Sequence, residues 1–167
     1  PELVMKILSP LHAESLVSWL ADTASACLID EARLSPKPGL VDSRGSGAHQ
    51  DLTLALMERS ARSLQPTFHA LAQQSWRRPA DIALRETVGR LGREGEAQMM
   101  LATGGVNTHR GAIWALGLLV SAVAMLGGEA RAHDVARTAA QLAYIIIAHL
   151  HFLSYGKRTP CRGSHIR

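Results

Sequence analysis

Residues 111–128 read GAIWALGLLVSAVAMLGG, a run of 18 positions without a charged side chain. A run of this length is near the lower limit for a helix that crosses a bilayer. It contains four glycines, and no second apolar run of similar length accompanies it. A helix that is apolar on all sides is also typical of the centre of a helical bundle. We therefore expect a buried central helix over residues 110–127 rather than a transmembrane helix.

The segments on both sides of this run carry apolar residues at helical spacing. Aromatic residues make up only 4% of the 167 residues, too few to fill the core of a sheet. We expect an all-α, single-domain bundle of about five to six helices over residues 1–150, with residues 151–167 as an irregular tail. The predicted helices cover about residues 10–33, 52–64, 80–102, 110–127 and 131–150. Pro66 either breaks the second of these helices or opens the next short helix, which runs to residue 76. The expected inward positions are Leu16, Leu20, Ala24 and Cys27 in the first helix and Leu84, Val88, Leu91, Gly95 and Met99 in the third long helix.

Charge and cysteine content narrow the function classes. The net charge of +4 is compatible with polyphosphate ligands. With two Phe, two Tyr and no recognisable nucleic-acid-binding motif, a nucleic-acid partner is not expected. The two cysteines, Cys27 and Cys161, form neither a disulfide framework nor a metal knuckle, so we expect a cytoplasmic protein. The subunit number is left open, with a homodimer as one option.

A glycine-rich loop, TGGVNTHRG at 103–111, precedes the apolar helix. Gly104 and Gly105 allow a tight turn, and Asn107 or Thr108 can cap the helix that follows. The free N–H groups at a helix N-terminus favour anions, and His109 and Arg110 add donors at the same end. The loop is therefore either a cradle for a phosphate chain or an ordinary cap on a tight turn.

Another polar loop, SPKPGLVDSRGSGAH at 35–49, follows the first helix. In chain order it is the first loop, and residues 103–111 form the second loop. Lys37 and Arg44 can neutralise phosphate, and His49 adds an imidazole. Asp42 and Asp51 carry the oxygen ligands that Mg²⁺ uses together with substrate phosphates. The alternative is a solvated surface loop in which Asp51 caps the next helix, and for Asp51 alone the cap is the favoured role.

Three glutamates lie beside these loops. Extending the first apolar stripe by one turn places Glu31 at a core position, where an unpaired carboxylate is costly. Glu31 should therefore face a cation or an arginine. Glu94 and Glu96 flank the apolar stripe of the third long helix on opposite sides, so a straight helix does not direct both at one metal ion. One of them is a candidate ligand or base, and the spacing does not say which.

These same residues carry a family resemblance. The segments EARLSPKPGLVDSRGSGAHQDL and GREGEAQMMLATGGVNTHRGAIWALGLL resemble the triphosphoribosyl-dephospho-CoA synthases, which make the prosthetic-group precursor of citrate lyase and malonate decarboxylase. Within these segments, the sequences VDSRGSGAH and RGAIWALGLL favour the malonate decarboxylase branch of the family. The resemblance covers about residues 21–126 and rests on two motifs in the right order.

The resemblance implies an all-helical, Mg²⁺-dependent enzyme. It implies transfer of the 5-triphosphoribosyl group of ATP to the ribose 2′-hydroxyl of 3′-dephospho-CoA, with release of adenine. Carried over residue by residue, it implies catalytic, phosphate-binding and metal-binding roles for three groups of residues. The catalytic group is Glu31, Glu94, Glu96 and His49; the phosphate or nucleotide group is Lys37, Arg44, Gly104, Gly105, Asn107, Thr108, His109 and Arg110; the metal group is Asp42 and Asp51.

The sequence departs from the family at its end. The family continues with a motif resembling YGxxGARGEA, whereas this chain reads HFLSYGKRTPCRGSHIR. We therefore expect a truncated or frameshifted C-terminal part and an exposed apolar face on the remaining helices. Two alternatives to the transferase stay open: a nucleotide-binding helical module without turnover, and a helical interaction protein whose charged loops are only surface.

Overall fold

The computed structural model describes the backbone of residues 2–155 and the side chains of residues 12–145. Over this range the chain forms helices and loops, without a strand beyond a single isolated bridge between Asp42 and Gly45. The prediction of an all-α bundle is therefore confirmed. The helices are α1 (Glu2–Arg33), α2 (Leu54–Ser63), α3 (Gln65–Ser75), α4 (Ile82–Ala102), α5 (Arg110–Met125) and α6 (Ala132–Tyr155).

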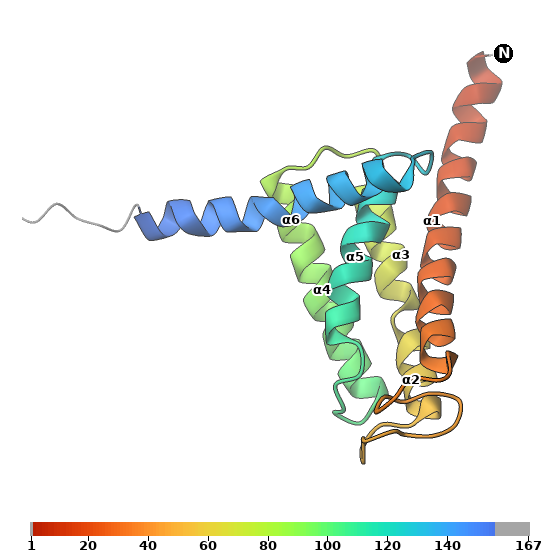
Figure 1. The fold of residues 1–167 in the computed structure, drawn as a ribbon. Coiled ribbons are helices and arrows are strands. Elements are labelled where there is room, and N and C mark those ends of the chain that lie inside the picture. Colours follow the sequence, from red (N-terminus) through yellow and green to blue (C-terminus); the bar gives the residue numbers. More distant parts are fainter. Residues whose placement is uncertain (1, 156–167) are drawn as a thin grey trace, which may run out of the picture.

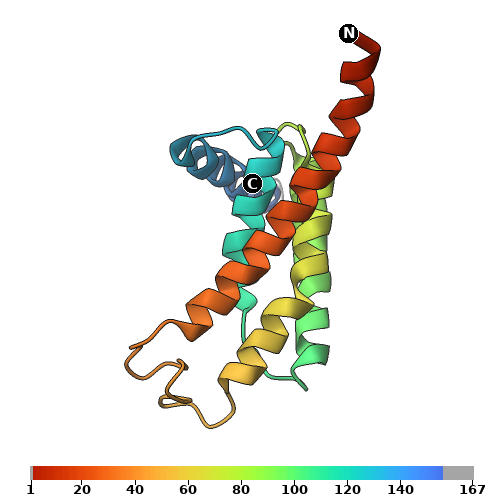
Figure 2. The same ribbon diagram turned by 90° about the vertical axis from the view of Figure 1, so that its right-hand side faces the viewer.

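Helices α1, α3, α4 and α5 lie side by side along the long direction of the molecule, and α6 lies across one end (Figures 1 and 2). The loop after α1 and the loop between α4 and α5 meet at the opposite end, next to α2. Both glycine-rich loops are therefore placed together, away from the start of α1 and the end of α6. This arrangement defines one polar end of the bundle, which we call the loop end (residues 31–53 and 103–110).

Local signals explain where the helices begin. Thr53 caps α2 by accepting the Leu56 backbone N–H at 3.2 Å, and Asp81 caps α4 by accepting that of Leu84 at 2.7 Å. Pro66 lies in the first turn of α3, where its missing N–H costs no hydrogen bond. The prediction that Asp51 caps the second helix is wrong. The helix starts three residues later than Asp51, and the hydroxyl of Thr53 supplies the cap instead.

The buried face of α1 differs from the predicted stripe by part of a turn. Leu20 and Ala24 are buried as expected, but Cys27 is exposed. The stripe runs instead through Val17, Ala21, Leu28 and Ala32, which are all buried. Because Leu28 rather than Cys27 continues the stripe, Ala32 takes the core position that was assigned to Glu31. The inward residues of α4 match the prediction, since Leu84, Val88, Gly95 and Met99 are buried and Leu91 is half-buried.

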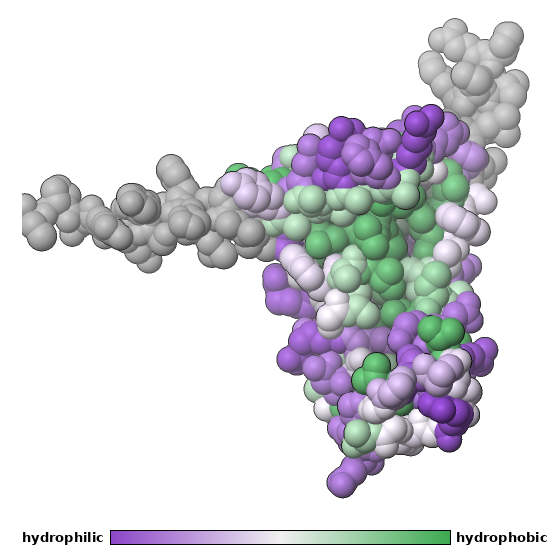
Figure 3. Space-filling view, viewed as in Figure 1, coloured by the Kyte–Doolittle hydropathy of each residue, from purple (hydrophilic) through white to green (hydrophobic). Residues whose placement is uncertain are grey.

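Helix α5 occupies the centre of the bundle and contacts α1, α3, α4 and α6. Its buried residues include Ile113, Leu118 and Val120, which confirms its central place. The expectation that α5 is buried on all sides is nevertheless wrong, because Trp114 is 46% exposed and Leu119 is 40% exposed. Figure 3 shows the apolar surface over this part of the molecule, so the expected exposed apolar face is present. None of the described helices is both long and apolar enough to cross a membrane.

The two terminal helices are longer than predicted. Helix α1 begins at Glu2 instead of near Pro10, and α6 continues to Tyr155, past the expected end at residue 150. A proline is a start signal, but a helix tolerates it in the interior at the cost of a backbone hydrogen bond. The predicted tail thus begins as helix, and its residues 156–167 lie outside the described residues.

Candidate functional site at the loop end of the bundle

The side chains of Ser60 on α2 and His109 in the second loop join this loop to α2. The Ser60 hydroxyl lies 2.8 Å from Nδ1 of His109 and also contacts the hydroxyl of Thr108. Ser60 is fully buried and His109 nearly so. The backbone N–H of His109 points at the sulfur of Met99, at 3.2 Å. These contacts fix the start of α5 against α2 and α4.

His109 is therefore an internal residue rather than a surface cation. Burial lowers the pKa of His109, and the nearby Glu31 carboxylate opposes part of that shift. Its Nε2 atom is buried without a hydrogen-bond partner among residues 12–145. A neutral imidazole is favoured in such a site because its charged form loses hydration. The predicted phosphate contact of His109 stays a prediction, and a neutral ring could contribute only a hydrogen bond to it.

Lys37 connects the first loop to the end of α1. Its Nζ donates to the Glu31 carboxylate at 3.0 Å and to the Glu31 backbone carbonyl at 2.6 Å. The Lys37 side chain is only 13% exposed, whereas that of Glu31 is 58% exposed. The expectation that Glu31 faces a cation is confirmed, and Glu31 also lies close enough to His109 to affect its pKa. Glu31 thus lies near both loops, on the surface rather than in the core.

Asp42 organises the first loop. Its carboxylate accepts hydrogen bonds from the backbone N–H groups of Lys37 (2.9 Å) and Arg44 (2.8 Å) and from the Ser35 hydroxyl (3.1 Å). The Arg44 guanidinium donates two more, at 2.9 and 3.0 Å. These donors, with the Arg44 guanidinium first, hold the pKa of Asp42 well below its ordinary value. Asp42 is buried, and it fixes the conformation that presents Lys37 and Arg44.

The second loop turns where the sequence places its two glycines. Gly104 and Gly105 have φ angles of +67° and +91°, in the left-handed region that favours glycine. The Gly105 N–H donates to the carbonyl of Met100 at 2.8 Å, which closes the end of α4. Asn107 accepts the Arg110 backbone N–H at 3.3 Å, but the N-cap of α5 is His109, which makes no capping side-chain hydrogen bond. The prediction that Asn107 or Thr108 caps this helix is therefore wrong. Gly104 and Gly105 serve the turn directly, and their contact with a phosphate stays a prediction.

The structure separates Glu96 from Glu94. The Glu96 carboxylate pairs with the Arg110 guanidinium at 2.6 Å, across the gap between α4 and α5. Glu94 pairs instead with Arg90 on the exposed side of α4, at 2.7 Å. Of the two, Glu96 therefore faces the loop end, and the role of either one as ligand or base stays a prediction.

Three ion pairs at this end share one pattern. Each predicted phosphate-binding cation is paired with a carboxylate that was predicted to be catalytic or metal-binding. The pairs are Lys37–Glu31, Arg44–Asp42 and Arg110–Glu96. An anionic ligand that binds one of these cations would compete with its carboxylate.

Side chains that could bind a metal ion are dispersed over the described part of the chain. Among residues 12–145, no three His, Cys, Asp or Glu side chains lie close enough to hold a metal ion. The Asp42 oxygens are already hydrogen-bonded, whereas Asp51 is exposed and makes no side-chain hydrogen bond within this range. His49 is half-buried and likewise makes no side-chain hydrogen bond there. The metal roles of Asp42 and Asp51 and the catalytic role of His49 stay predictions.

Sequence reasoning missed Ser60 and Arg85. Ser60 lies in an ordinary amphipathic helix, and only the long-range contact with His109 distinguishes it. Arg85 is buried on α4, four residues before Gly89 and eight before Arg93. The spacing Arg-x₃-Gly-x₃-Arg on one helix face could have indicated it, because residues four apart lie on the same side.

Comparison with known proteins agrees with this picture. Residues 17–152 match the profile of the ATP:dephospho-CoA triphosphoribosyl transferase family. The chain is 89% identical over 139 residues to the 2-(5″-triphosphoribosyl)-3′-dephosphocoenzyme-A synthase of Klebsiella pneumoniae, which covers 83% of this chain and 50% of the relative. It is 60% identical over 131 residues to the probable synthase of Azotobacter vinelandii, with 77% and 44% covered. No solved structure matches.

The chain spans about half the length of the curated relatives it matches. The matched segment nevertheless includes α2 to α5 complete, both glycine-rich loops and the ion pairs Lys37–Glu31, Arg44–Asp42 and Arg110–Glu96. It also includes most of the chain, from the middle of α1 into α6. The chain therefore belongs to the ATP:dephospho-CoA triphosphoribosyl transferase family.

Proposed function

We propose that this protein transfers the 5-triphosphoribosyl group of ATP to the ribose 2′-hydroxyl of 3′-dephospho-CoA and releases adenine. The observation that carries the proposal is the meeting of both loops at one end of the bundle, where cations and carboxylates alternate within hydrogen-bond distance. The family match, together with relatives that are named as synthases of the corresponding product, supports this reading.

The reaction defines what the site must supply. The 2′-oxygen of the acceptor forms a bond to C1′ of the ATP ribose as the bond from C1′ to the adenine nitrogen breaks. The hydroxyl proton passes to a base, and the departing adenine takes up a proton. Such a displacement at a glycosidic carbon passes through an oxocarbenium-like transition state. It therefore needs a carboxylate or imidazole as the base and positive charge around the retained triphosphate.

Lys37 and Arg110 are the proposed triphosphate contacts. Arg110 opens α5, whose N-terminal N–H groups favour an anion, and Lys37 is held in a stiff loop beside two prolines. Their carboxylate partners, Glu31 and Glu96, are the proposed base candidates. A phosphate that takes the cation leaves the carboxylate free to accept a proton. Substrate binding and activation of the base are then linked by one exchange of partners.

Magnesium is proposed as the cation that accompanies ATP. When bound, Mg²⁺ neutralises part of the triphosphate charge and typically keeps few protein ligands. Asp51 fits this role because it is exposed and unpaired within residues 12–145, whereas Asp42 would have to give up hydrogen bonds. MgATP should raise the melting temperature of the chain, and Asp51→Asn should reduce that rise with little change in the ligand-free value. An unchanged rise in both Asp51→Asn and Asp42→Asn would remove the metal role from both residues.

The setting of the reaction is also a proposal. The sequences of both motifs support prosthetic-group synthesis for malonate decarboxylase, and the two widely separated cysteines support a cytoplasmic location. Genes for malonate decarboxylase subunits beside the coding sequence would support the first part. Genes for citrate lyase there would contradict it.

Adenine release tests the proposed reaction directly. The purified chain is incubated with ATP, Mg²⁺ and 3′-dephospho-CoA, and free adenine is measured by chromatography. We expect release that depends on both substrates, with a large loss in Glu31→Gln or Glu96→Gln and none in the matched control Glu94→Gln. ATP binding without adenine release would favour the alternative of a nucleotide-binding module without turnover. That alternative is supported by the ion pairs, which occupy every candidate base at the loop end except His49.

A further inference from the structure

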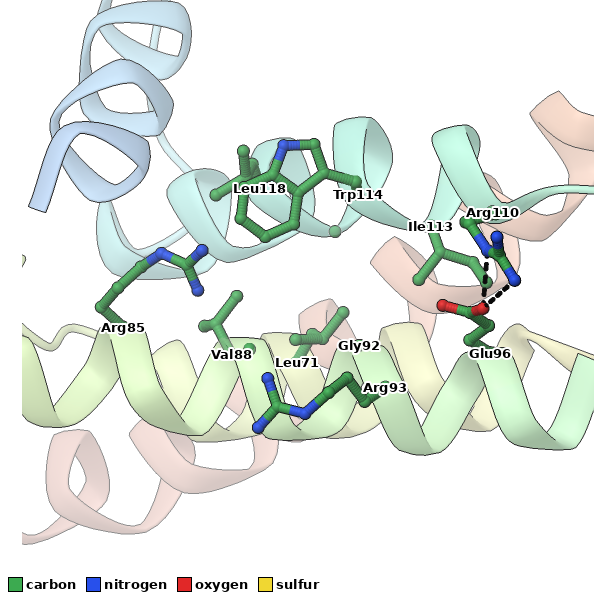
Figure 4. Close-up of a pocket in the computed structure, with 12 residues that line it drawn as sticks. Leu71, Arg85, Val88, Gly92, Arg93, Glu96, Arg110, Ile113, Trp114 and Leu118 are labelled. Carbon is green, nitrogen blue, oxygen red and sulfur yellow. Dashed lines mark hydrogen bonds and ion pairs between the residues drawn. The ribbon is translucent and has the colours of Figure 1, made fainter. Parts of the chain in front are cut away.

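A cavity of about 360 Å³ lies between α4 and α5, next to the loop end (Figure 4). Pockets of this size hold small molecules. Its apolar wall is formed by Val88, Ile113, Leu118 and Trp114. Among residues 12–145, the charged groups of its lining are three arginines, Arg85, Arg93 and Arg110, and one carboxylate, Glu96. Because Glu96 is paired with Arg110, the charges of Arg85 and Arg93 are left without a carboxylate in the cavity.

Arg85 is the unusual member of this lining. It is only 4% exposed, and its Nε has no hydrogen-bond partner among the described residues. The guanidinium lies over the Trp114 ring, 4.5 Å from the ring centre, and Figure 4 shows both side chains facing the cavity. Burial, with a smaller effect of Arg93, lowers the pKa of Arg85. Buried arginines are almost always paired with an anion, because an unpaired buried charge is costly. Residues 135–155, which form the rest of α6, contain no Asp or Glu.

Two of the guanidinium groups converge on one point. A Cβ atom placed on Gly89 would lie 3.0 Å from a terminal nitrogen of Arg85 and 3.4 Å from one of Arg93. Like charges this close repel each other unless an anion lies between them. The absence of a side chain at Gly89 lets both guanidinium groups lie against the backbone of α4 at that point. Two guanidinium groups held side by side on one wall of a cavity are donors that suit the oxygens of a phosphate.

We propose that Arg85 and Arg93 bind the diphosphate group of a second nucleotide in this cavity, and that this nucleotide is the 3′-dephospho-CoA acceptor. The identity of the acceptor rests on the proposed function. ATP is assigned to the loop end, and the Arg110–Glu96 pair stands where that end meets the cavity. A donor and an acceptor bound on the two sides of this pair would be neighbours. The apolar wall of Val88, Leu118 and Trp114 suits the pantetheine arm that continues from the acceptor's diphosphate.

The probe for this site is inorganic pyrophosphate, titrated calorimetrically into the purified chain without Mg²⁺. We expect Arg85→Met to weaken binding by roughly ten- to a hundredfold, which is the scale of one charge-assisted hydrogen-bond set. Arg93→Gln should also weaken it. Arg90→Gln is the matched control, since it removes the same charge from the exposed side of α4, where Arg90 pairs with Glu94. Equal losses in all three variants, or no binding to the unmodified chain, would overturn the proposal.

Stability separates an anion site from a structural role of Arg85. If no ligand is bound, replacing an unpaired buried charge with Met should leave the free energy of unfolding unchanged or raise it. A marked loss of stability in Arg85→Met would mean that the arginine supports the fold through Trp114, and would contradict the site. Gly89→Ala gives a second test that keeps both arginines. Its methyl group would lie 3.0 Å from a terminal nitrogen of Arg85 and 3.4 Å from one of Arg93, so it should displace both groups, and pyrophosphate binding should fall while the protein stays folded.

The assignment to the acceptor is tested by comparing two ligands in Arg85→Met. Dephospho-CoA binding should fall and ATP binding should stay within about twofold of the unmodified chain, a difference below 0.5 kcal/mol. Loss of ATP binding, alone or equally with dephospho-CoA, would overturn the acceptor assignment. The pyrophosphate titration requires no turnover, so it can succeed when adenine release fails. Conversely, Arg85→Met could release adenine with the same KM for dephospho-CoA as the unmodified chain. That result would contradict the acceptor site but not the proposed function.

Discussion

Arg110 can bind a phosphate only by leaving Glu96. Both side chains are partly exposed, and pairs of this kind contribute about 0–1 kcal/mol. Removing the competing carboxylate with Glu96→Gln should therefore tighten binding of inorganic triphosphate by about two- to fivefold. Glu94→Gln changes the same charge on the same helix and should have no effect. The affinities are measured by calorimetry without metal, and weaker binding in Glu96→Gln would place Arg110 outside the phosphate site.

A second variant removes the cation, Arg110, instead of its carboxylate partner. Arg110→Ala should lower the affinity for ATP and for inorganic triphosphate by roughly ten- to a hundredfold, because a charge-assisted hydrogen bond to phosphate is lost. Adenosine binding should stay nearly unchanged, since the residue faces the phosphate chain. Equilibrium binding of all three ligands decides this. If adenosine binding weakens as much as triphosphate binding, Arg110 contacts the base or supports the fold.

Asp42 makes the folded protein sensitive to acid. The pKa of Asp42 is depressed in the folded chain, so the unfolded chain binds a proton first as the pH falls. The stability that the carboxylate contributes is thus fully present above about pH 4, the unfolded value, and is lost progressively below it. Urea unfolding between pH 3 and 7 should show a steeper loss below pH 4 in the unmodified chain than in Asp42→Asn. Asp51→Asn, which changes an exposed carboxylate, should keep the steep loss, and identical profiles for all three proteins would contradict the role of Asp42.

At the scale of elements, Ser60 joins α2 to the start of α5. Ser60→Ala leaves Nδ1 of buried His109 without its partner, which should reduce the free energy of unfolding by about 1–3 kcal/mol. Ser63→Ala is the control in the same helix, because the Ser63 hydroxyl only donates to the backbone carbonyl of Ser60. Chemical unfolding followed by circular dichroism gives both values. Equal, small losses in the two variants would show that the α2–α5 contact does not depend on this hydrogen bond.

Helix positions could be predicted from the sequence, because they depend on local periodicity and on glycine and proline. The α4 face of Leu84, Val88 and Met99 is an example. The face of α1 could not be placed as well, because alanines fill both its buried and exposed sides and tolerate either environment. Ala32 rather than Glu31 is buried, and only the tertiary structure sets which side of α1 packs against α2 and α3.

At the scale of the whole molecule, the sequence motifs identified which loops matter but not how their side chains pair. The pairing of Lys37 with Glu31 and of Arg110 with Glu96 depends on how distant helices end beside each other. The Arg85–Arg93 site was missed for the same reason. A buried arginine looks like any other charged helical residue until the packing of α4 on α5 is known.

Hydrogen exchange with and without MgATP tests the central claim that the loop end is the nucleotide site. Loop amides exchange quickly unless a ligand orders them, and a ligand that binds the folded state slows their opening. The account predicts slower exchange in residues 35–51 and 103–112 and little change along the exposed side of α4 around Arg90. Unchanged exchange in both loops, with protection confined to another part of the chain, would contradict it.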